Sequence, residues 1–110
     1  MKFTESLKKN RMFRNVYSRG SSRANRLLVM YVLPNEAEIN RLGISVSKKV
    51  GNSVVRNKVT RRIRESYRLA ETRPARGNDI IIIARTDANT ATYAGIDKAV
   101  RHLLKKHGIG

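Results

Sequence analysis

Two short apolar runs limit the folds that this chain can adopt. Residues 80–83 read IIII, and residues 27–33 read LLVMYVL before a break at Pro34-Asn35. The isoleucine run is too short and too rich in β-branched side chains to favour a helix over a buried strand. The earlier run is apolar on both faces, which is typical of a strand inside a sheet. The sequence therefore predicts a sheet that contains strands over 27–33 and 79–84.

A third strand and a loop are predicted next to these runs. Residues 42–47, LGISVS, place Leu42, Ile44 and Val46 on one face and only glycine and serine on the other. This alternation indicates a strand with one covered face and one open face that is small and polar. The stretch GSSRANR, residues 20–26, is polar and is predicted to be a loop.

Three segments have the spacing of amphipathic helices. The first begins with Asn10 as its N-cap and stops at Gly20 in a left-handed conformation. The second begins after Asn52 as its cap and runs to about Leu69 or Arg73. The third has an apolar stripe and is stopped by Gly108; the stripe comprises Tyr93, Ile96, Val100, Leu103, Leu104 and His107.

The resulting order of elements is α-β-β-α-β-α, with room for one more short strand. It predicts an α/β (α+β) two-layer sandwich in which a small mixed sheet is covered on one face by helices. At 110 residues the chain has the length of one domain, which we expect to span residues 1–110.

The charge of the chain indicates a polyanionic partner. With 24 Lys and Arg against 8 Asp and Glu, the net charge is +16, a self-repulsion that binding to nucleic acid would relieve. The chain has no Cys, which suits a reducing compartment. Its apolar runs are too short to cross a bilayer, and the first residues, MKFTESLKK, lack the apolar stretch of a signal peptide. We therefore expect a cytoplasmic protein with no membrane partner and no small-molecule substrate.

Half of this charge lies on and around the second helix. Between Lys48 and Arg76 there are ten basic and two acidic residues, a net charge of +8 (10 − 2). The side predicted to pack on the sheet comprises Val55, Val59, Ile63, Ser66, Tyr67 and Ala70. The opposite side comprises Asn57, Arg61, Arg64 and Arg68, and the residues that flank the seam are Arg56, Lys58 and Arg62, so the exposed surface is nearly all basic. A merely solvated face is the alternative, but such faces normally mix both signs of charge, so a phosphate-binding surface is favoured.

The abundance of arginine favours one kind of nucleic acid. A planar guanidinium can hold two phosphate oxygens or stack on an unpaired base, and both suit folded RNA. A reader of duplex DNA would be expected to have a helix-turn-helix or zinc module, and the sequence shows neither.

Aromatic side chains predict a second part of the site. Phe13 and Tyr17 are one turn apart on the first helix, and Tyr31 shares a strand face with Val29. If Ser45 neighbours that face, these side chains form a groove that binds single-stranded RNA by stacking. The alternative, in which Phe13 and Tyr17 fill the core, is equally compatible with the pattern.

The sequence shows no catalytic constellation. A nuclease needs a cage of carboxylates for metal ions, or an acid and base such as histidine. His102 and His107 lie on one helix about 140° apart, which places them poorly as joint metal ligands. Asp79 and Asp87 bracket a strand and lie at its opposite ends. We therefore predict no catalytic or metal-binding residue, and if RNA is cut, another component cuts it.

Three stretches together resemble the protein subunit of bacterial ribonuclease P: NRMFRNVYSRG, GISVSKKVGNSVVRNKVTRRIRE and DIIIIAR. The resemblance covers almost the whole chain, and its most specific part is the Gly-Asn turn followed by an Arg-Asn-basic cluster. In that family the protein assists a catalytic RNA that removes the 5′ leader from precursor tRNA, and the RNA performs the hydrolysis with magnesium ions. The resemblance implies ribonuclease P RNA and precursor tRNA as partners, no cofactor bound by the protein, and a left-handed crossover in the fold.

The resemblance also implies a role for each part of the site. The basic side of the second helix, with the seven residues named above, faces the RNA subunit. A cleft between the first helix and the sheet takes the leader, and its matching positions are Phe13, Tyr17, Val29, Tyr31, Ser45, Lys48 and Lys49. Two positions depart from the family pattern. Lys58 replaces a usual arginine and keeps the charge without the planar fork, and Tyr17 replaces a usual phenylalanine and keeps the stacking face.

Two other functions fit parts of the sequence. A small basic ribosomal or RNA-chaperone protein would have the same size and charge, and only the motif separates it from the ribonuclease P reading. A stand-alone RNA hydrolase is disfavoured because the sequence shows no catalytic constellation.

Overall fold

The computed structural model describes residues 1–71 and 77–110 and contains a five-stranded sheet with three α-helices. The elements in chain order are β1 (Thr4–Ser6), α1 (Asn10–Arg19), β2 (Ser21–Ala24), β3 (Leu28–Pro34), β4 (Asn40–Ser45), α2 (Ser53–Ala70), β5 (Asn78–Ala84), the 3₁₀ helix η1 (Thr86–Thr90) and α3 (Tyr93–Lys106). The second helix thus ends near the earlier of its two predicted positions. The later one, Arg73, lies outside the described residues.

The strands are ordered β1-β4-β5-β3-β2, and the sheet is mixed. β1 and β5 both run parallel to β4, whereas β3 is antiparallel to β5 and β2 is antiparallel to β3. The two apolar strands β3 and β5 therefore both lie inside the sheet, which confirms that prediction. The neighbours β4 and β5 are joined through α2, and this connection is the crossover whose left-handed sense the family resemblance implies.

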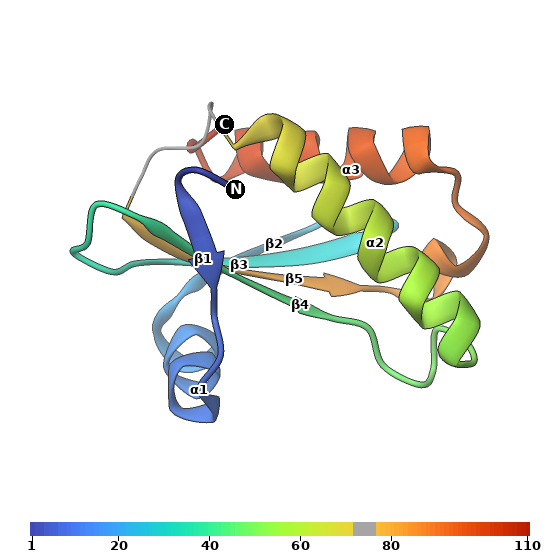
Figure 1. Cartoon of the computed structure of the whole chain (residues 1–110), viewed down its shortest axis with the longest axis horizontal. Coiled ribbons are helices and arrows are strands. Elements are labelled where there is room, and N and C mark those ends of the chain that lie inside the picture. The colour runs from blue at the N-terminus through green and yellow to red at the C-terminus, as the bar shows by residue number, and fades with distance from the viewer. Residues whose placement is uncertain (72–76) are drawn as a thin grey trace.

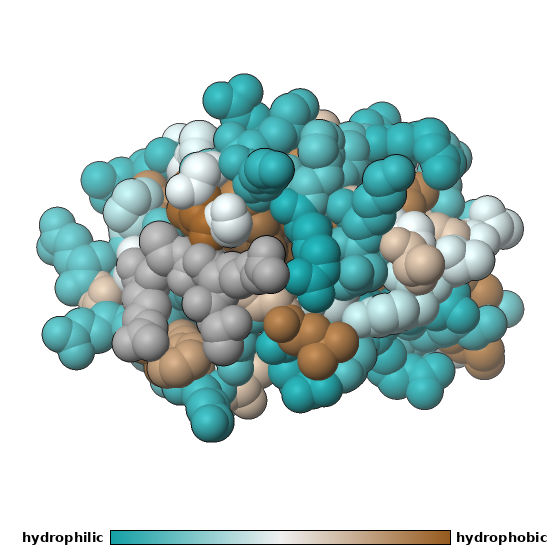
Figure 2. Space-filling model, turned by 90° about the horizontal axis from the view of Figure 1, so that it is seen from above, coloured by the Kyte–Doolittle hydropathy of each residue, from teal (hydrophilic) through white to brown (hydrophobic). Residues whose placement is uncertain are grey.

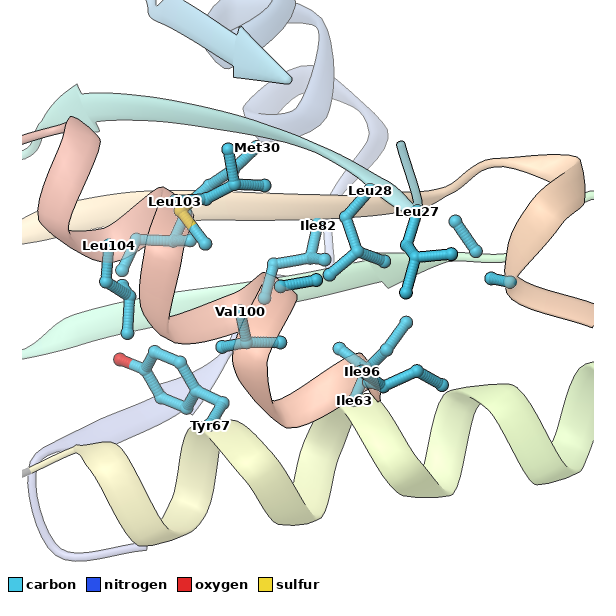
Figure 3. Packing of buried hydrophobic residues seen from close by; sticks show 14 of the residues in the cluster. Leu27, Leu28, Met30, Ile63, Tyr67, Ile82, Ile96, Val100, Leu103 and Leu104 are labelled. Atoms are coloured by element: carbon cyan, nitrogen blue, oxygen red, sulfur yellow. The ribbon is translucent and has the colours of Figure 1, made fainter. Parts of the chain in front are cut away.

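α2 and α3 cover one face of the sheet and bury the main core (Figure 1). In Figure 3 the side chains of Ile63 and Tyr67 on α2 and Val100 on α3 point toward Met30 and Ile82 of the sheet. All five side chains are fully buried. The predicted inward side of α2 is confirmed. Its buried residues are Val59, Ile63, Ser66, Tyr67 and Ala70, and Val55 is partly exposed and packs against the same cluster.

α1 lies against the opposite face of the sheet (Figure 1). It buries Val16 against Leu7 and Ile81, with Met12 and Phe13 packed at the edge of this second cluster. The two-layer arrangement predicted from the sequence therefore holds for α2 and α3. Beyond it, α1 adds a partial third layer that leaves part of this face open.

The predicted ends of α1 were wrong in detail. Lys9, and not Asn10, is the N-cap, and its side chain makes no capping hydrogen bond. Gly20 is extended, with φ −76° and ψ 162°, and so does not stop the helix in a left-handed conformation. A Cβ there would lie 2.6 Å from the carbonyl oxygen of Val16, so glycine is needed because the chain turns back tightly against its own helix.

Two edge strands escaped the sequence pattern. Residues 21–24, predicted as a loop, form β2, whose side chains are all exposed. An edge strand with no buried face has no apolar alternation to reveal it. β1 is only three residues long and pairs Thr4–Ser6 with residues 40–42 of β4.

The caps of the other two helices follow local sequence rules. Asn52 accepts a hydrogen bond from the backbone N–H of Val55 at 3.0 Å, as predicted. Thr92 accepts from the N–H of Gly95 at 3.1 Å and so sets Tyr93 as the first residue of α3. Gly108 follows α3 with φ +74°, as its predicted role as a stop requires.

The first residues are held against the end of α2 by polar contacts. The buried carboxylate of Glu71 accepts hydrogen bonds from the backbone N–H groups of Lys2 at 2.7 Å and Phe3 at 3.3 Å. Next to it, the hydroxyl of Thr4 is 2.9 Å from that of buried Tyr67. These contacts fix β1 to the helix layer as well as to the sheet.

Candidate nucleic-acid interface

The outward side of α2 forms a basic surface, which we call the basic helix surface. Asn57, Lys58, Arg61 and Arg64 are exposed along it, and Arg56 is partly exposed. Only one acidic residue, Glu65, lies within α2. Figure 2 looks onto the side of the molecule formed by α2 and α3, which is mostly hydrophilic with apolar areas of small extent. The fold therefore presents to solvent the cations that the sequence pattern placed together.

Two arginines of this surface also have partners within the protein. Arg62 donates a hydrogen bond to the carbonyl oxygen of Ala91 at 2.6 Å and so links α2 to the segment before α3. Arg68 pairs with Glu65 through both carboxylate oxygens. The hydrogen bonds from Arg68 lower the pKa of the Glu65 carboxyl. Neither arginine is thus as free as Arg61 or Arg64, for which no such pairing is found in the described part of the chain.

A second surface lies where α1 meets the sheet, and we call it the α1–sheet surface; it comprises Phe13, Tyr17, Val29, Tyr31 and Ser45. The ring centroids of Phe13 and Tyr17 are 6.4 Å apart, and those of Tyr17 and Tyr31 are 5.1 Å apart in an edge-to-face arrangement. Tyr17 keeps 40% of its surface exposed. Partial burial, and secondarily Tyr31, raise the pKa of the Tyr17 hydroxyl, so it stays protonated at neutral pH. The three rings form a continuous aromatic row at the margin of the open part of the sheet.

The strand register gives the floor of the α1–sheet surface. Ser45 on β4 pairs with Ile83 on β5, and Ile83 pairs with Val29 on β3. Ser45 therefore lies on the same face as Val29, as predicted, with Ile83 between them in the row. Sequence spacing could not show that β5 would insert between β3 and β4.

Lys48 and Lys49 lie in the turn between β4 and α2 and are exposed. They follow Ser45 at the carboxyl end of β4, so they extend the row of Ser45 toward the start of the basic helix surface. No contact that would fix either side chain is found in the described residues.

One cavity brings the two surfaces together. A space of about 370 Å³ is lined by β1, by Leu42, Gly43 and Ile44 of β4, by Phe13 of α1 and by Arg64 of α2. Phe13 belongs to the α1–sheet surface and Arg64 to the basic helix surface. The two surfaces therefore meet at this edge of the sheet.

The remaining candidates for chemistry have structural partners. His107 Nε2 is 2.8 Å from the carbonyl oxygen of Met30, and His102 Nδ1 is 3.2 Å from the side-chain amide of Asn25. Asp79 is buried and accepts a hydrogen bond from Asn35, and Asp87 forms an exposed ion pair with Arg26. In residues 1–71 and 77–110, no group of three or more His, Cys, Asp or Glu side chains could hold a metal ion. None of the helices in that same part of the chain is long and apolar enough to span a membrane.

Two residues near these surfaces were not identified from the sequence as part of a site. Gly43 was read only as part of a small polar face, yet Phe13 packs on its backbone. Tyr93 was assigned to the apolar stripe of α3, yet it lines a cavity with cations of α2. Neither contact leaves a signal in sequence spacing, because each joins elements that are far apart in the chain.

Comparisons with known proteins agree on one family. A family model described as Ribonuclease P matches residues 1–108. The ribonuclease P protein component of Lachnoclostridium phytofermentans is 56% identical over 106 residues, covering 96% of this chain and 91% of that protein. The structure of the Staphylococcus aureus RNase P protein has a TM-score of 0.88 and 42% identity, covering 97% of this chain and 96% of that one. The Thermotoga maritima RNase P protein has a TM-score of 0.85 at 28% identity, covering 92% and 96%. This chain therefore belongs to the family of ribonuclease P protein components.

Proposed function

We propose that this protein component binds two RNAs through its two surfaces. The basic helix surface binds the RNA subunit of ribonuclease P, and the α1–sheet surface holds the 5′ leader of precursor tRNA. Membership of the family makes the chain an RNA-binding subunit of the tRNA-processing endoribonuclease. The rival readings, as a ribosomal or RNA-chaperone protein, have no support in the comparisons. The cytoplasm stays the predicted compartment.

The observation that carries the first half of the proposal is the exposed, nearly uncompensated charge of α2. Arg61 and Arg64 are exposed and one turn apart. Like charges so close together destabilise a helix unless a partner neutralises them. A guanidinium can hold two phosphate oxygens at once, so the surface suits a folded RNA backbone.

The leader half of the proposal rests on the aromatic row. A single strand laid over Val29 and Ser45 would have the rings of Tyr17 and Tyr31 beside its bases. Stacking of that kind contributes on the order of 1–3 kcal/mol per base and is tolerant of sequence. Lys48 and Lys49 would add phosphate contacts at the carboxyl end of β4.

Cleavage itself is assigned to the RNA subunit. The described residues offer no metal cage, and the histidines are held by structural hydrogen bonds. By the family resemblance, magnesium ions act with the RNA. The protein's role is to bring positive charge to the assembled RNAs, so it lowers the magnesium concentration that cleavage requires.

The decisive experiment is reconstitution with a ribonuclease P RNA and precursor tRNA. Purified protein alone leaves precursor tRNA intact, and with the RNA subunit it raises cleavage at low magnesium. Cleavage by rigorously RNA-free protein would contradict this assignment.

Tyr17→Ala tests the leader surface in the same assay. The holoenzyme with this variant binds precursor tRNA more weakly by about 1–3 kcal/mol and binds mature tRNA as before, whereas Tyr17→Phe is nearly silent. Circular dichroism establishes that the Ala variant folds. If precursor and mature tRNA lose affinity equally, the ring belongs to the core of the protein and not to a leader surface.

A further inference from the structure

A second cavity, shallow and open to solvent, lies on the basic helix surface against the start of α3. It has a volume of about 370 Å³ and is lined by Lys58, Arg61, Arg62, Glu65 and Tyr93. Tyr93 comes from a different helix from the other four residues, and it belongs to neither of the two apolar clusters of the protein. The cavity therefore places one aromatic ring among three cations and one carboxylate.

The position of Tyr93 is fixed by its neighbours. The side chain of Thr92 caps α3 through the N–H of Gly95, which makes Tyr93 the first helical residue. Two positions before Tyr93, the carbonyl oxygen of Ala91 accepts the hydrogen bond from Arg62 at 2.6 Å. The ring is thus held by a capped helix and by a direct link to α2, so the wall of the cavity is formed before any ligand arrives.

The ring, and not the hydroxyl, is what Tyr93 offers to a ligand. Its Oη atom is buried and has no hydrogen-bond partner within the described residues. A buried hydroxyl without a partner costs free energy and gives no reason for tyrosine over phenylalanine. The remaining contribution of this side chain at a partly exposed position is a flat aromatic surface.

The carboxylate distinguishes the ligand further. Glu65 is the only acidic residue of α2, and it lies beside the three cations that line this cavity. A bare phosphate would be attracted by the three cations but would use neither the ring nor the carboxylate. A nucleobase can use both, because its amino or imino groups can donate hydrogen bonds to the carboxylate lone pairs that Arg68 leaves free while its face stacks on an aromatic ring.

We propose that this cavity holds one unpaired base of the ribonuclease P RNA subunit, stacked on Tyr93, while Lys58 and Arg61 bind the flanking phosphates. The inference rests on the proposed function of the basic helix surface. The RNA subunit is the source because the cavity lies in the layer of α2 and α3, on the opposite side of the sheet from α1 and the aromatic row proposed for the leader (Figure 1). Arginine and aromatic side chains that alternate around an extruded base are a common mode of recognition in folded RNA.

The test compares three variants in binding to the RNA subunit over a series of salt concentrations. Tyr93→Leu weakens binding roughly 5- to 150-fold, the loss that corresponds to 1–3 kcal/mol for one stacked base. Its log–log salt slope stays that of the unchanged protein, because the ring carries no charge. Tyr93→Phe binds normally. Tyr17→Leu, the same change on the other surface, leaves affinity for the RNA subunit unaltered and weakens binding of precursor tRNA.

Two further results separate this inference from the proposed function. If Arg61→Ala lowers the salt slope by roughly 0.7–0.9 but Tyr93→Leu binds normally, the basic helix surface binds RNA and the base pocket is wrong. If neither variant changes binding, both the base pocket and the proposed RNA-binding function of the basic helix surface are wrong.

A photo-crosslinking amino acid at position 93 provides a readout that does not depend on how well Tyr93→Leu folds. In the assembled holoenzyme with precursor tRNA, it crosslinks to one short region of the RNA subunit. Crosslinks to precursor tRNA alone, or none to RNA, would overturn the inference.

Discussion

The ring of Phe13 lies directly on the backbone of Gly43. A Cβ atom on residue 43 would be 2.6 Å from Cζ and 2.7 Å from Cε1 of Phe13, distances that side chains do not tolerate. Gly43 is in the middle of β4 on the sheet face that α1 covers, where it pairs with Ile81. The absence of a side chain at this one position therefore lets the Phe13 ring lie against β4 and sets its height over the sheet.

Gly43→Ala should displace Phe13 and disturb the α1–sheet surface. We expect a loss of about 1–3 kcal/mol in the free energy of unfolding, as for other overpacked sites, measured by urea unfolding. Binding of precursor tRNA by the holoenzyme should weaken, while binding of mature tRNA stays the same. Gly95→Ala is the matched control, since a Cβ there meets only ordinary contacts, 3.4 Å from Thr92 Oγ1. It should raise stability by about 0.5–1 kcal/mol, as glycine is unfavourable within a helix.

Arg61→Ala and Arg62→Ala should separate RNA binding from folding. Arg62 donates to the carbonyl oxygen of Ala91 across the α2–α3 junction, so its removal leaves a partly buried acceptor unpaired. We expect Arg62→Ala to lose about 1–3 kcal/mol in unfolding free energy. Arg61 is exposed, so Arg61→Ala should change stability by less than about 0.5 kcal/mol while reducing the salt slope of RNA binding. Equal stabilities of the two variants would show that the Arg62 contact contributes nothing.

Glu71→Gln should loosen the first strand. The buried carboxylate of Glu71 accepts two backbone N–H groups, from Lys2 and Phe3, and a neutral amide has only one acceptor oxygen to replace it. Hydrogen bonds to charged groups contribute about 1.5–3 kcal/mol each, so a loss of about 2 kcal/mol is expected. Thermal unfolding followed by circular dichroism measures it, and hydrogen exchange should locate the change in β1. Glu65→Gln, at an exposed position, is the control and should leave the melting temperature nearly unchanged.

His107 should make stability depend on pH, with a loss that begins as the pH falls below about 6.5, the ordinary pKa of histidine. Burial is the main cause that lowers its pKa in the folded protein; nearby Arg23 lowers it further, and the hydrogen bond to Met30 opposes both. Because the unfolded chain binds a proton more readily, the contribution of neutral His107 is complete above the unfolded pKa of about 6.5 and is lost as the pH falls toward the folded pKa.

His107→Gln should therefore flatten the dependence of unfolding free energy on pH in this window. His102→Gln, on the exposed side of α3, serves as the control. If both variants follow the pH profile of the unchanged protein, protonation of His107 does not limit its stability.

Local sequence patterns were sufficient to predict the helices and strands that bury one or both faces. The apolar side of α2, the cap at Asn52 and the interior strands β3 and β5 all follow from periodicity and capping, because each depends on residues close in sequence. β2 could not be found in this way, since its residues, SSRA, are exposed on every side and only the partner strand β3 makes them extended.

Some features of the candidate site were likewise predictable from local sequence patterns, and others were not. The α-helical rotation of 100° per residue was enough to predict which residues of α2 face outward. It also predicted that Phe13 and Tyr17 share one face of α1. The place of Ile83 between Ser45 and Val29, and that of Tyr93 beside Arg61, depend on the order of strands and the docking of helices. Those are properties of the assembled chain, and no local pattern encodes them.

The central position of β5 has a consequence for how the protein folds. β3 and β4 are consecutive strands but do not pair, since β5 lies between them. Within residues 1–71 and 77–110, the sheet hydrogen bonds that join the β1-β4 pair to the β3-β2 pair all come from β5. The parallel pair β1-β4 and the antiparallel pair β3-β2 therefore wait for a segment made more than thirty residues after β4, which is a long and slow closure compared with local contacts. The α1–sheet surface takes Ser45 from one half and Val29 from the other. A nascent chain should consequently acquire the ability to hold a single strand of RNA in one late step, together with its cooperative stability, and not by degrees.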